Sequence, residues 1–202
     1  MFLGAYDLRK KLKISELAAK KSHIVFTHVK KNIKIIKEFT KAKDVKLIYR
    51  GLKSSEFSSS KIFKKDPLLF CTIGLLEKHK NIDKIILTFK SIKKKFPSAK
   101  LFIIGTGSQE INLKNLASKY DLSSSVRFLG WVKRRVIHNV MSRANFYLHF
   151  SKMEALPNSI KEAMYNKCFV ISSKTFGIDE LIKDKVNGYI VDPNNTKKIL
   201  KI

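Results

Sequence analysis

The sequence contains two carboxylates, separated by seven residues, whose type and spacing could support a chemical reaction. Glu154 lies in a loop after an apolar, aromatic run at 146–150 that predicts a buried strand, and Glu162 lies in a helix expected to begin near Asn158. A strand, a short loop and a helix start together present free backbone N–H groups to an anion. A carboxylate there would repel a phosphate unless it accepts hydrogen bonds from hydroxyls, which indicates a phosphate-linked polyol such as a nucleotide sugar. From spacing alone, a loop glutamate plus a solvated helix glutamate is the favoured alternative.

Glycines end three of the other apolar runs, at Gly74, Gly105 and Gly130. Gly74 permits a tight turn close to a ligand, and Lys80 at the start of the next helix could act on a phosphate together with the helix dipole. A dinucleotide fingerprint and a GxxxxGK[ST] phosphate loop are absent from the sequence. The aromatic loop around Trp131 could line a base pocket or merely pack against its neighbours, and both interpretations stay open.

Histidine and cysteine spacing predicts no metal site. None of the five histidines is spaced for metal binding with another histidine or with a cysteine. His149 is expected to be a core histidine in its strand. Cys71 and Cys168 lie in apolar runs, which indicates buried, reduced thiols.

From residue 66 onward, apolar runs alternate with amphipathic helical patterns. Continuous apolar strands between such helices predict an α/β fold with a Rossmann-like parallel sheet and helices on both faces. The carboxyl ends of the strands then share one edge, where ligands bind. The expected strands are 68–73, 101–104, 126–129, 146–150, 169–171 and 189–191.

The first 64 residues hold too few elements for a complete sheet. They predict two helices and two strands, followed by a Ser- and Lys-rich linker at 51–65. We therefore expect residues 1–64 to be the remnant of an N-terminal domain with its linker, and residues 65–202 to be a second domain. The four expected elements are a helix at 14–21, a strand at 23–27, a helical face at 33–39 and a strand at 45–49.

The chain is strongly basic, with 42 Lys and Arg against 16 Asp and Glu and a net charge of +26. Such a balance indicates polyanionic partners, namely nucleic acid, anionic membrane or phosphorylated ligands. Only six of the basic residues are arginine, the better reader of bases and phosphates, which favours a general compositional bias over a recognition surface. No apolar run is long enough to span a membrane, and no secretory signal is expected at the start.

Taken together, the sequence between about 68 and 193 resembles the C-terminal half of a retaining glycosyltransferase of family 4, which has the GT-B fold. The most specific part is 154–164, which resembles the E-x7-E signature of that family followed by Ala-Met. Four further segments fall in the order of the family, namely 102–107, 126–130, 176–180 and 187–193. The resemblance reverses the preference stated above, and it favours a role in ligand binding or catalysis for the two glutamates over a loop glutamate plus a solvated helix glutamate.

The resemblance implies a role for each matching residue. Glu162 would bond the ribose hydroxyls of a nucleotide, and Glu154, the implied catalytic residue, would face the donor sugar. Lys80 and the backbone at the helix start would hold the diphosphate, so that neither a metal nor a separate cofactor is expected. The implied donor-binding set is Gly74, Lys80, Gly105, Gly130, Leu156, Pro157, Asn158, Ser159 and Glu162.

The implied activity is transfer of a hexose from a nucleotide-diphosphate sugar to a polysaccharide or lipid-linked acceptor, with retention of configuration. Leu75 stands where the family usually places an arginine, which removes one diphosphate cation. Most of the N-terminal domain and the closing helix are expected to be missing, so a separate chain supplying the N-terminal domain and an anionic membrane surface are further candidate partners. We expect a cytoplasmic protein, peripheral at the inner face of the membrane. The alternatives are an inactive nucleotide-binding remnant and a basic nucleic-acid-binding module.

Overall fold

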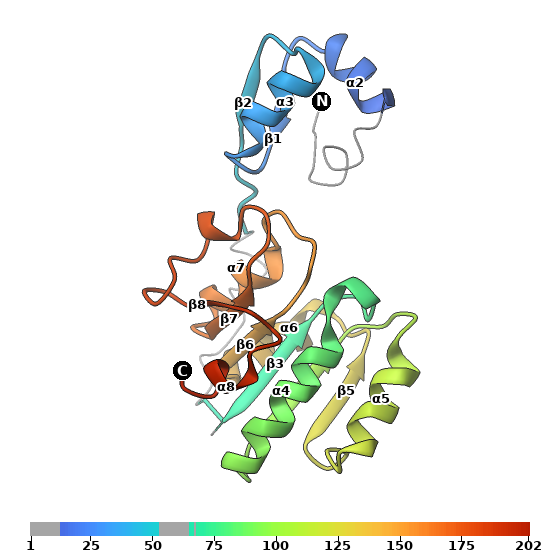
Figure 1. Cartoon of the computed structure of the whole chain (residues 1–202), viewed down its shortest axis with the longest axis vertical. Coiled ribbons are helices and arrows are strands. Elements are labelled where there is room, and N and C mark those ends of the chain that lie inside the picture. Colours follow the sequence, from blue (N-terminus) through green and yellow to red (C-terminus); the bar gives the residue numbers. More distant parts are fainter. Residues whose placement is uncertain (1–12, 53–64, 67) are drawn as a thin grey trace. The chain divides into compact units, whose positions relative to one another are not determined.

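The structure is a computed structural model that describes residues 13–52, 65–66 and 68–202, and it divides into two compact units (Figure 1). One unit comprises residues up to Gly51 together with 154–157 and 175–181. The other comprises 52–153, 158–174 and 182–202 and contains the larger sheet. The predicted linker falls mostly within 53–64, outside the described residues.

The larger unit is built on a six-stranded parallel sheet with the order β5-β4-β3-β6-β7-β8. Helices flank both faces of this sheet (Figure 1). One group consists of α4 with its neighbours α5 and α8, and the other consists of α6 and α7. The predicted Rossmann-like architecture is confirmed. The strands are β3 (Leu69–Ile73), β4 (Lys100–Ile104), β5 (Val126–Gly130), β6 (Phe146–His149), β7 (Phe169–Ser173) and β8 (Tyr189–Val191). The helical elements are η2 (Lys78–Lys80), α4 (Ile82–Lys95), α5 (Glu110–Lys119), α6 (Arg134–Arg143), α7 (Asn158–Tyr165) and α8 (Thr196–Ile199).

Burial on both faces of the central strands explains their continuous apolar sequence. In β3 the first four residues are all buried. Helix α4 buries one apolar face that includes Ile85, Ile86 and Phe89, and it ends just before Pro97, where a helix cannot continue. Cys71 and Cys168 are buried free thiols, as predicted.

The smaller unit contains α2 (Lys13–Lys20), β1 (Val25–Thr27), α3 (Asn32–Thr40) and β2 (Val45–Leu47), with β1 and β2 paired in parallel. Its apolar cluster joins Ala19, Val25, Ile36 and Val45. The carboxylate of Glu180, from the 175–181 segment, accepts hydrogen bonds from the backbone N–H groups of Lys30 at 3.0 Å and Lys31 at 3.4 Å, immediately before α3. A carboxylate at this position compensates the positive end of the helix.

The expected elements are present, with differences at their ends. The first strand begins at Val25 rather than residue 23, and the second ends at Leu47 rather than residue 49. Between β7 and β8 the chain forms the 3-10 turn η3 (Ile178–Glu180). Within the described residues, no helix has the length and apolar character needed to cross a membrane.

Candidate functional site

The three predicted glycine turns lie side by side at the carboxyl edge of the larger sheet. The Gly74 amide donates to the carbonyl of Ile104 at 3.0 Å, and the Gly105 amide donates to the carbonyl of Gly130 at 2.8 Å. Strands β3, β4 and β5 therefore remain hydrogen-bonded into the turns that follow them. The three turns are therefore neighbours along this edge.

Gly105 allows two of these turns to touch. A β-carbon built on Gly105 would lie 1.9 Å from the carbonyl oxygen of Gly74, and its φ of +129° is one that L side chains rarely adopt. Gly130 also has a positive φ, of +65°, but a β-carbon there would meet nothing within 4 Å. Only the first of these glycines is therefore required by close packing.

Lys80 lies beside the first turn. It ends η2, and a β-carbon added to Gly74 would lie 3.9 Å from Cε of Lys80. The aliphatic part of the lysine therefore passes next to the Gly74 backbone. The structure thus brings together the glycine turn and the lysine that the sequence analysis assigned to a diphosphate.

Glu77 ties the first turn to the turn that follows β4, a link that the sequence analysis missed. Its carboxylate accepts hydrogen bonds from the backbone N–H of Ser108 at 2.9 Å and from the hydroxyl of Ser108 at 2.8 Å. These bonds, the backbone one first, lower the pKa of Glu77 below the ordinary glutamate value. The two glycine-containing turns are therefore joined by side-chain as well as backbone contacts.

We expect the pKa of Glu77, measured by carboxyl NMR titration, to rise in the Ser108→Ala variant while staying below the ordinary value. The variant loses the hydroxyl but keeps the backbone N–H, which is the larger cause. Because the folded pKa is lowered, this carboxylate stabilises the turn above the ordinary glutamate pKa, and the contribution is lost as the pH falls through the folded value. Glu77→Gln identifies the signal, and an unchanged pKa in Ser108→Ala would contradict the assigned bonds.

Glu162 is held by an ion pair that the sequence analysis also missed. Its side chain is buried within α7, and Oε1 lies 2.6 Å from a guanidinium nitrogen of Arg134, the first residue of α6. The only sequence signal was that Arg134 is one of six arginines and follows the aromatic loop. This arginine fixes the orientation of the carboxylate and compensates its charge in a buried position.

Asn158 and Ser159 form the start of α7, next to the central strands. The hydroxyl of Tyr147, on β6, donates to the carbonyl of Ile73 at 3.3 Å and also interacts with the Ser159 side chain. Burial is the main cause that raises the pKa of Tyr147, so the phenol stays protonated and can donate. His149, on the same strand, is buried and stacks on the Tyr147 ring, as expected for a core histidine.

The remaining predicted residues, Glu154, Leu156 and Pro157, belong to the smaller unit, together with the 175–181 segment. Within that unit, a β-carbon on Gly177 would lie 2.9 Å from the carbonyl oxygen of Ala155. The glycine turn therefore lets the 154–157 loop approach closely. The predicted placement of Glu154 and Glu162 on either side of one donor stays a prediction.

The aromatic loop after β5 presents its tryptophan to solvent. The side chain of Trp131 is 76% exposed, and that of Leu75, after β3, is 60% exposed. The interpretation that Trp131 merely packs against its neighbours is therefore not supported. An exposed indole at the carboxyl edge of the sheet is available for stacking on a flat ligand.

Comparison with known proteins places these features in a family context. The family model for glycosyl transferases group 1 matches residues 53–201. An uncharacterized glycosyltransferase, MJ1069, from Methanocaldococcus jannaschii is 30% identical over 199 residues, which cover 92% of this chain and 50% of that protein. The gpi3 subunit of a phosphatidylinositol N-acetylglucosaminyltransferase from Schizosaccharomyces pombe is 32% identical over 125 residues, which cover 62% of this chain and 27% of that protein. The chain thus spans half or less of the length of these relatives.

Two solved structures share the fold at low sequence identity. The pneumococcal O-GlcNAc transferase GtfA, in complex with UDP and GlcNAc, matches with a TM-score of 0.79 and 18% identity, covering 93% of this chain and 38% of that one. Anabaena Alr3699/HepE, in complex with UDP and glucose, matches with a TM-score of 0.78 and 17% identity, covering 99% of this chain and 59% of that one.

Proposed function

Because the chain belongs to the group 1 glycosyl transferases, we propose that it supplies the donor site of a hexosyltransferase. The donor is a nucleotide-diphosphate sugar bound at the carboxyl edge of the larger sheet. The observation that carries the proposal is the position of Lys80 beside the Gly74 turn, where the turns of three neighbouring strands meet. A lysine beside the glycine turns at this edge suits a diphosphate.

Within this proposal each group has one task. Lys80 and the backbone of 156–159 neutralise the diphosphate as it leaves, which takes the place of a metal ion and needs no separate cofactor. Glu162 accepts hydrogen bonds from the ribose hydroxyls, and Glu154 faces the donor sugar as the catalytic group of a retaining transfer. Because Leu75 stands in place of a second cation, Lys80 is the principal positive charge that contacts the phosphates.

The proposed acceptor is a polysaccharide or glycolipid at the cytoplasmic face of a membrane. Helix α2 supports a membrane-facing surface, because Ile14 and Leu17 are 76% and 59% exposed on a helix that begins and ends with lysine. A second protein chain is a further proposed partner, because one structure of similar fold is that of the GtfA/B complex.

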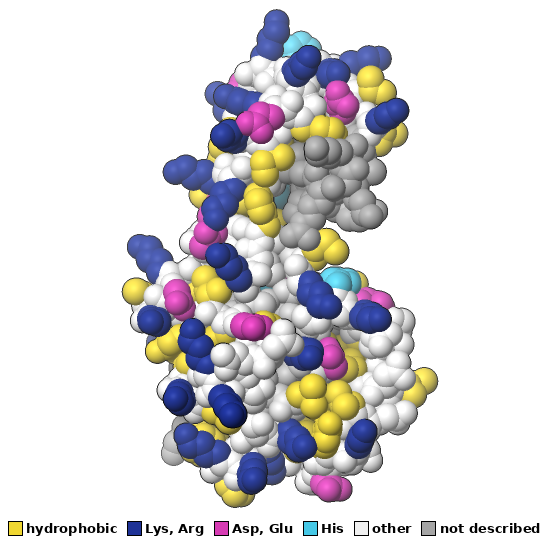
Figure 2. All heavy atoms as spheres, viewed as in Figure 1, with side chains coloured by type: hydrophobic (Ala, Val, Ile, Leu, Met, Phe, Trp, Pro, Cys, Tyr) yellow, Lys and Arg dark blue, Asp and Glu magenta, His cyan; other side chains and the backbone are white. Residues whose placement is uncertain are grey.

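A basic nucleic-acid-binding module is the alternative from another class. Figure 2 shows Lys and Arg side chains scattered over the visible face rather than gathered in one stripe, which disfavours it. A salt titration against random duplex DNA separates the two, because a steep log–log dependence of affinity on salt would favour nucleic acid. The other alternative is an inactive remnant. Such a protein would bind nucleotide but would release no nucleoside diphosphate in the presence of acceptor lipid.

Thermal-shift and calorimetric titration with UDP, GDP, ADP and their sugars tests the donor site. We expect at least one nucleoside diphosphate to bind, and Lys80→Ala to weaken that binding by roughly tenfold or more, since a charge-assisted hydrogen bond is worth about 1.5–3 kcal/mol. Lys100→Ala is the matched control, because Lys100 is an exposed lysine at the amino end of β4. Equal losses in the two variants would show that general charge, not this turn, binds the nucleotide.

A further inference from the structure

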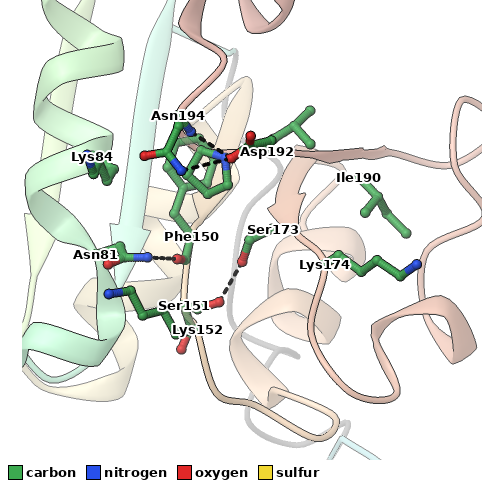
Figure 3. Close-up of a pocket in the computed structure, with 12 residues that line it drawn as sticks. Asn81, Lys84, Phe150, Ser151, Lys152, Ser173, Lys174, Ile190, Asp192 and Asn194 are labelled. Carbon is green, nitrogen blue, oxygen red and sulfur yellow. Dashed lines mark hydrogen bonds between the residues drawn. The ribbon is translucent and has the colours of Figure 1, made fainter.

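A cavity of about 790 Å³ lies in the larger unit and is lined by none of the residues assigned to the donor (Figure 3). It is formed by the segments that follow β6, β7 and β8 and by the start of α4. Its volume falls in the range of small-molecule sites, which is about 300–1,000 Å³. No local sequence pattern indicates this cavity, because its lining comes from four separate segments.

The charges on the cavity wall are mostly positive. Lys84, Lys152 and Lys174 line it, and Asp192 is its one carboxylate. Figure 3 shows Lys84 and Lys152 on the side of α4, with Lys174 across the cavity. Asn81 and Lys84, at the start of the 14-residue helix α4, are part of this wall. The positive end of the helix dipole therefore adds to the charges of Lys84 and Lys152.

Another part of the wall is polar and suited to hydroxyl groups. Oδ1 of Asp192 accepts hydrogen bonds from the backbone N–H of Asn194 at 2.9 Å and from its side-chain amide at 3.1 Å. Carboxylate and amide groups held in this way can exchange hydrogen bonds with the hydroxyls of a sugar. The cavity wall thus combines cationic groups with groups that can bind hydroxyls.

Hydrogen bonds fix the base of the cavity before any ligand enters. The side-chain amide of Asn81 donates to the carbonyl of Phe150 at 2.9 Å, and the Ser173 hydroxyl donates to the carbonyl of Ser151 at 2.6 Å. The backbone N–H of Lys152 donates to the carbonyl of His79 at 2.8 Å. These bonds join the start of α4, the end of β6 and the end of β7, so the backbone at the base of the cavity is already ordered.

We propose that this cavity is a second ligand site, distinct from the donor site, that binds a sugar phosphate. The phosphate lies against Lys84 and Lys152 at the start of α4, and the sugar hydroxyls lie against Asp192 and Asn194. The site needs no residue of the proposed donor set, so it stands or falls independently of the donor assignment.

Isothermal titration of the full chain with glucose 6-phosphate, inorganic phosphate and glucose tests the site. We expect glucose 6-phosphate to bind more tightly than either of the other two probes. The double variant Lys84→Ala/Lys152→Ala should weaken it at least tenfold, whereas Lys80→Ala, at the donor turn, should leave it unchanged. Circular dichroism melts of the variants establish that each is folded.

Three results would overturn the proposal. The first is no binding of glucose 6-phosphate to the parent chain. The second is equal affinity for inorganic phosphate, which would remove the sugar from the assignment. The third is an equal loss in Lys80→Ala and in the double variant, which would place the ligand at the donor turn instead. In addition, Asp192→Asn should lower the preference for glucose 6-phosphate over inorganic phosphate, and an unchanged preference would contradict the assignment of the sugar hydroxyls to Asp192.

Discussion

Gly105→Ala is expected to destabilise the larger unit by more than about 4 kcal/mol, a loss that few single substitutions reach. The added β-carbon would lie 1.9 Å from the carbonyl oxygen and 2.9 Å from the carbonyl carbon of Gly74. Both atoms belong to the backbone, so relief requires the turns after β3 and β4 to move apart. That movement would also break the hydrogen bonds from Gly74 to Ile104 and from Gly105 to Gly130.

Gly130→Ala is the matched control, because Gly130 lies on the same edge and has a positive φ of +65°, but a β-carbon added there would have no neighbour within 4 Å. We expect it to cost only about 1–2 kcal/mol, the penalty of a left-handed conformation for an L residue. Urea unfolding followed by circular dichroism measures both variants. Comparable losses would mean that backbone conformation, rather than contact between the two turns, makes Gly105 necessary.

The glycine turns and the secondary structure could be predicted because their signals are local. Apolar runs ending in Gly74, Gly105 and Gly130 mark strand ends whatever the order of the strands. The apolar spacing along α4, followed by Pro97, likewise predicts a helix and its end. The shared edge of carboxyl ends then follows from the parallel orientation of the strands.

Contacts between distant side chains could not be predicted in this way. Arg134 and Glu162 are 28 residues apart, and Glu77 and Ser108 are 31 apart. Nothing in the local pattern of either residue identifies its partner, because many lysines, arginines and serines are equally available along the chain. The cavity depends on the same kind of information, since strand order decides which loops become neighbours.

The division into units also limits what the sequence implied about the two glutamates. Spacing places Glu154 and Glu162 eight positions apart, and the family resemblance assigns them to one donor. The structure groups Glu154 with the N-terminal segment and Glu162 with the larger sheet. Their tasks can therefore be tested separately, Glu162 through nucleotide binding and Glu154 through transfer of the sugar.

Glu162→Ala is expected to weaken binding of the preferred nucleoside diphosphate by about 100-fold. The carboxylate would accept hydrogen bonds from two ribose hydroxyls, each worth about 1.5–3 kcal/mol when the acceptor is charged. Its burial and its 2.6 Å contact with Arg134 mean that the carboxylate is already oriented in the unliganded protein. Calorimetric titration of the parent and the variant measures the loss.

A 2′-deoxy nucleotide shows whether this loss comes from the ribose. The parent should bind the ribonucleotide about tenfold or more tightly than its 2′-deoxy analogue, and Glu162→Ala should bind the two nearly equally, because the acceptor for the 2′-hydroxyl is gone. Glu110→Ala, which removes a carboxylate paired with Lys114 on α5, controls for the change in charge. If Glu162→Ala kept the ribose preference of the parent, the carboxylate would serve only to pair with Arg134, and the nucleotide would have to be held elsewhere.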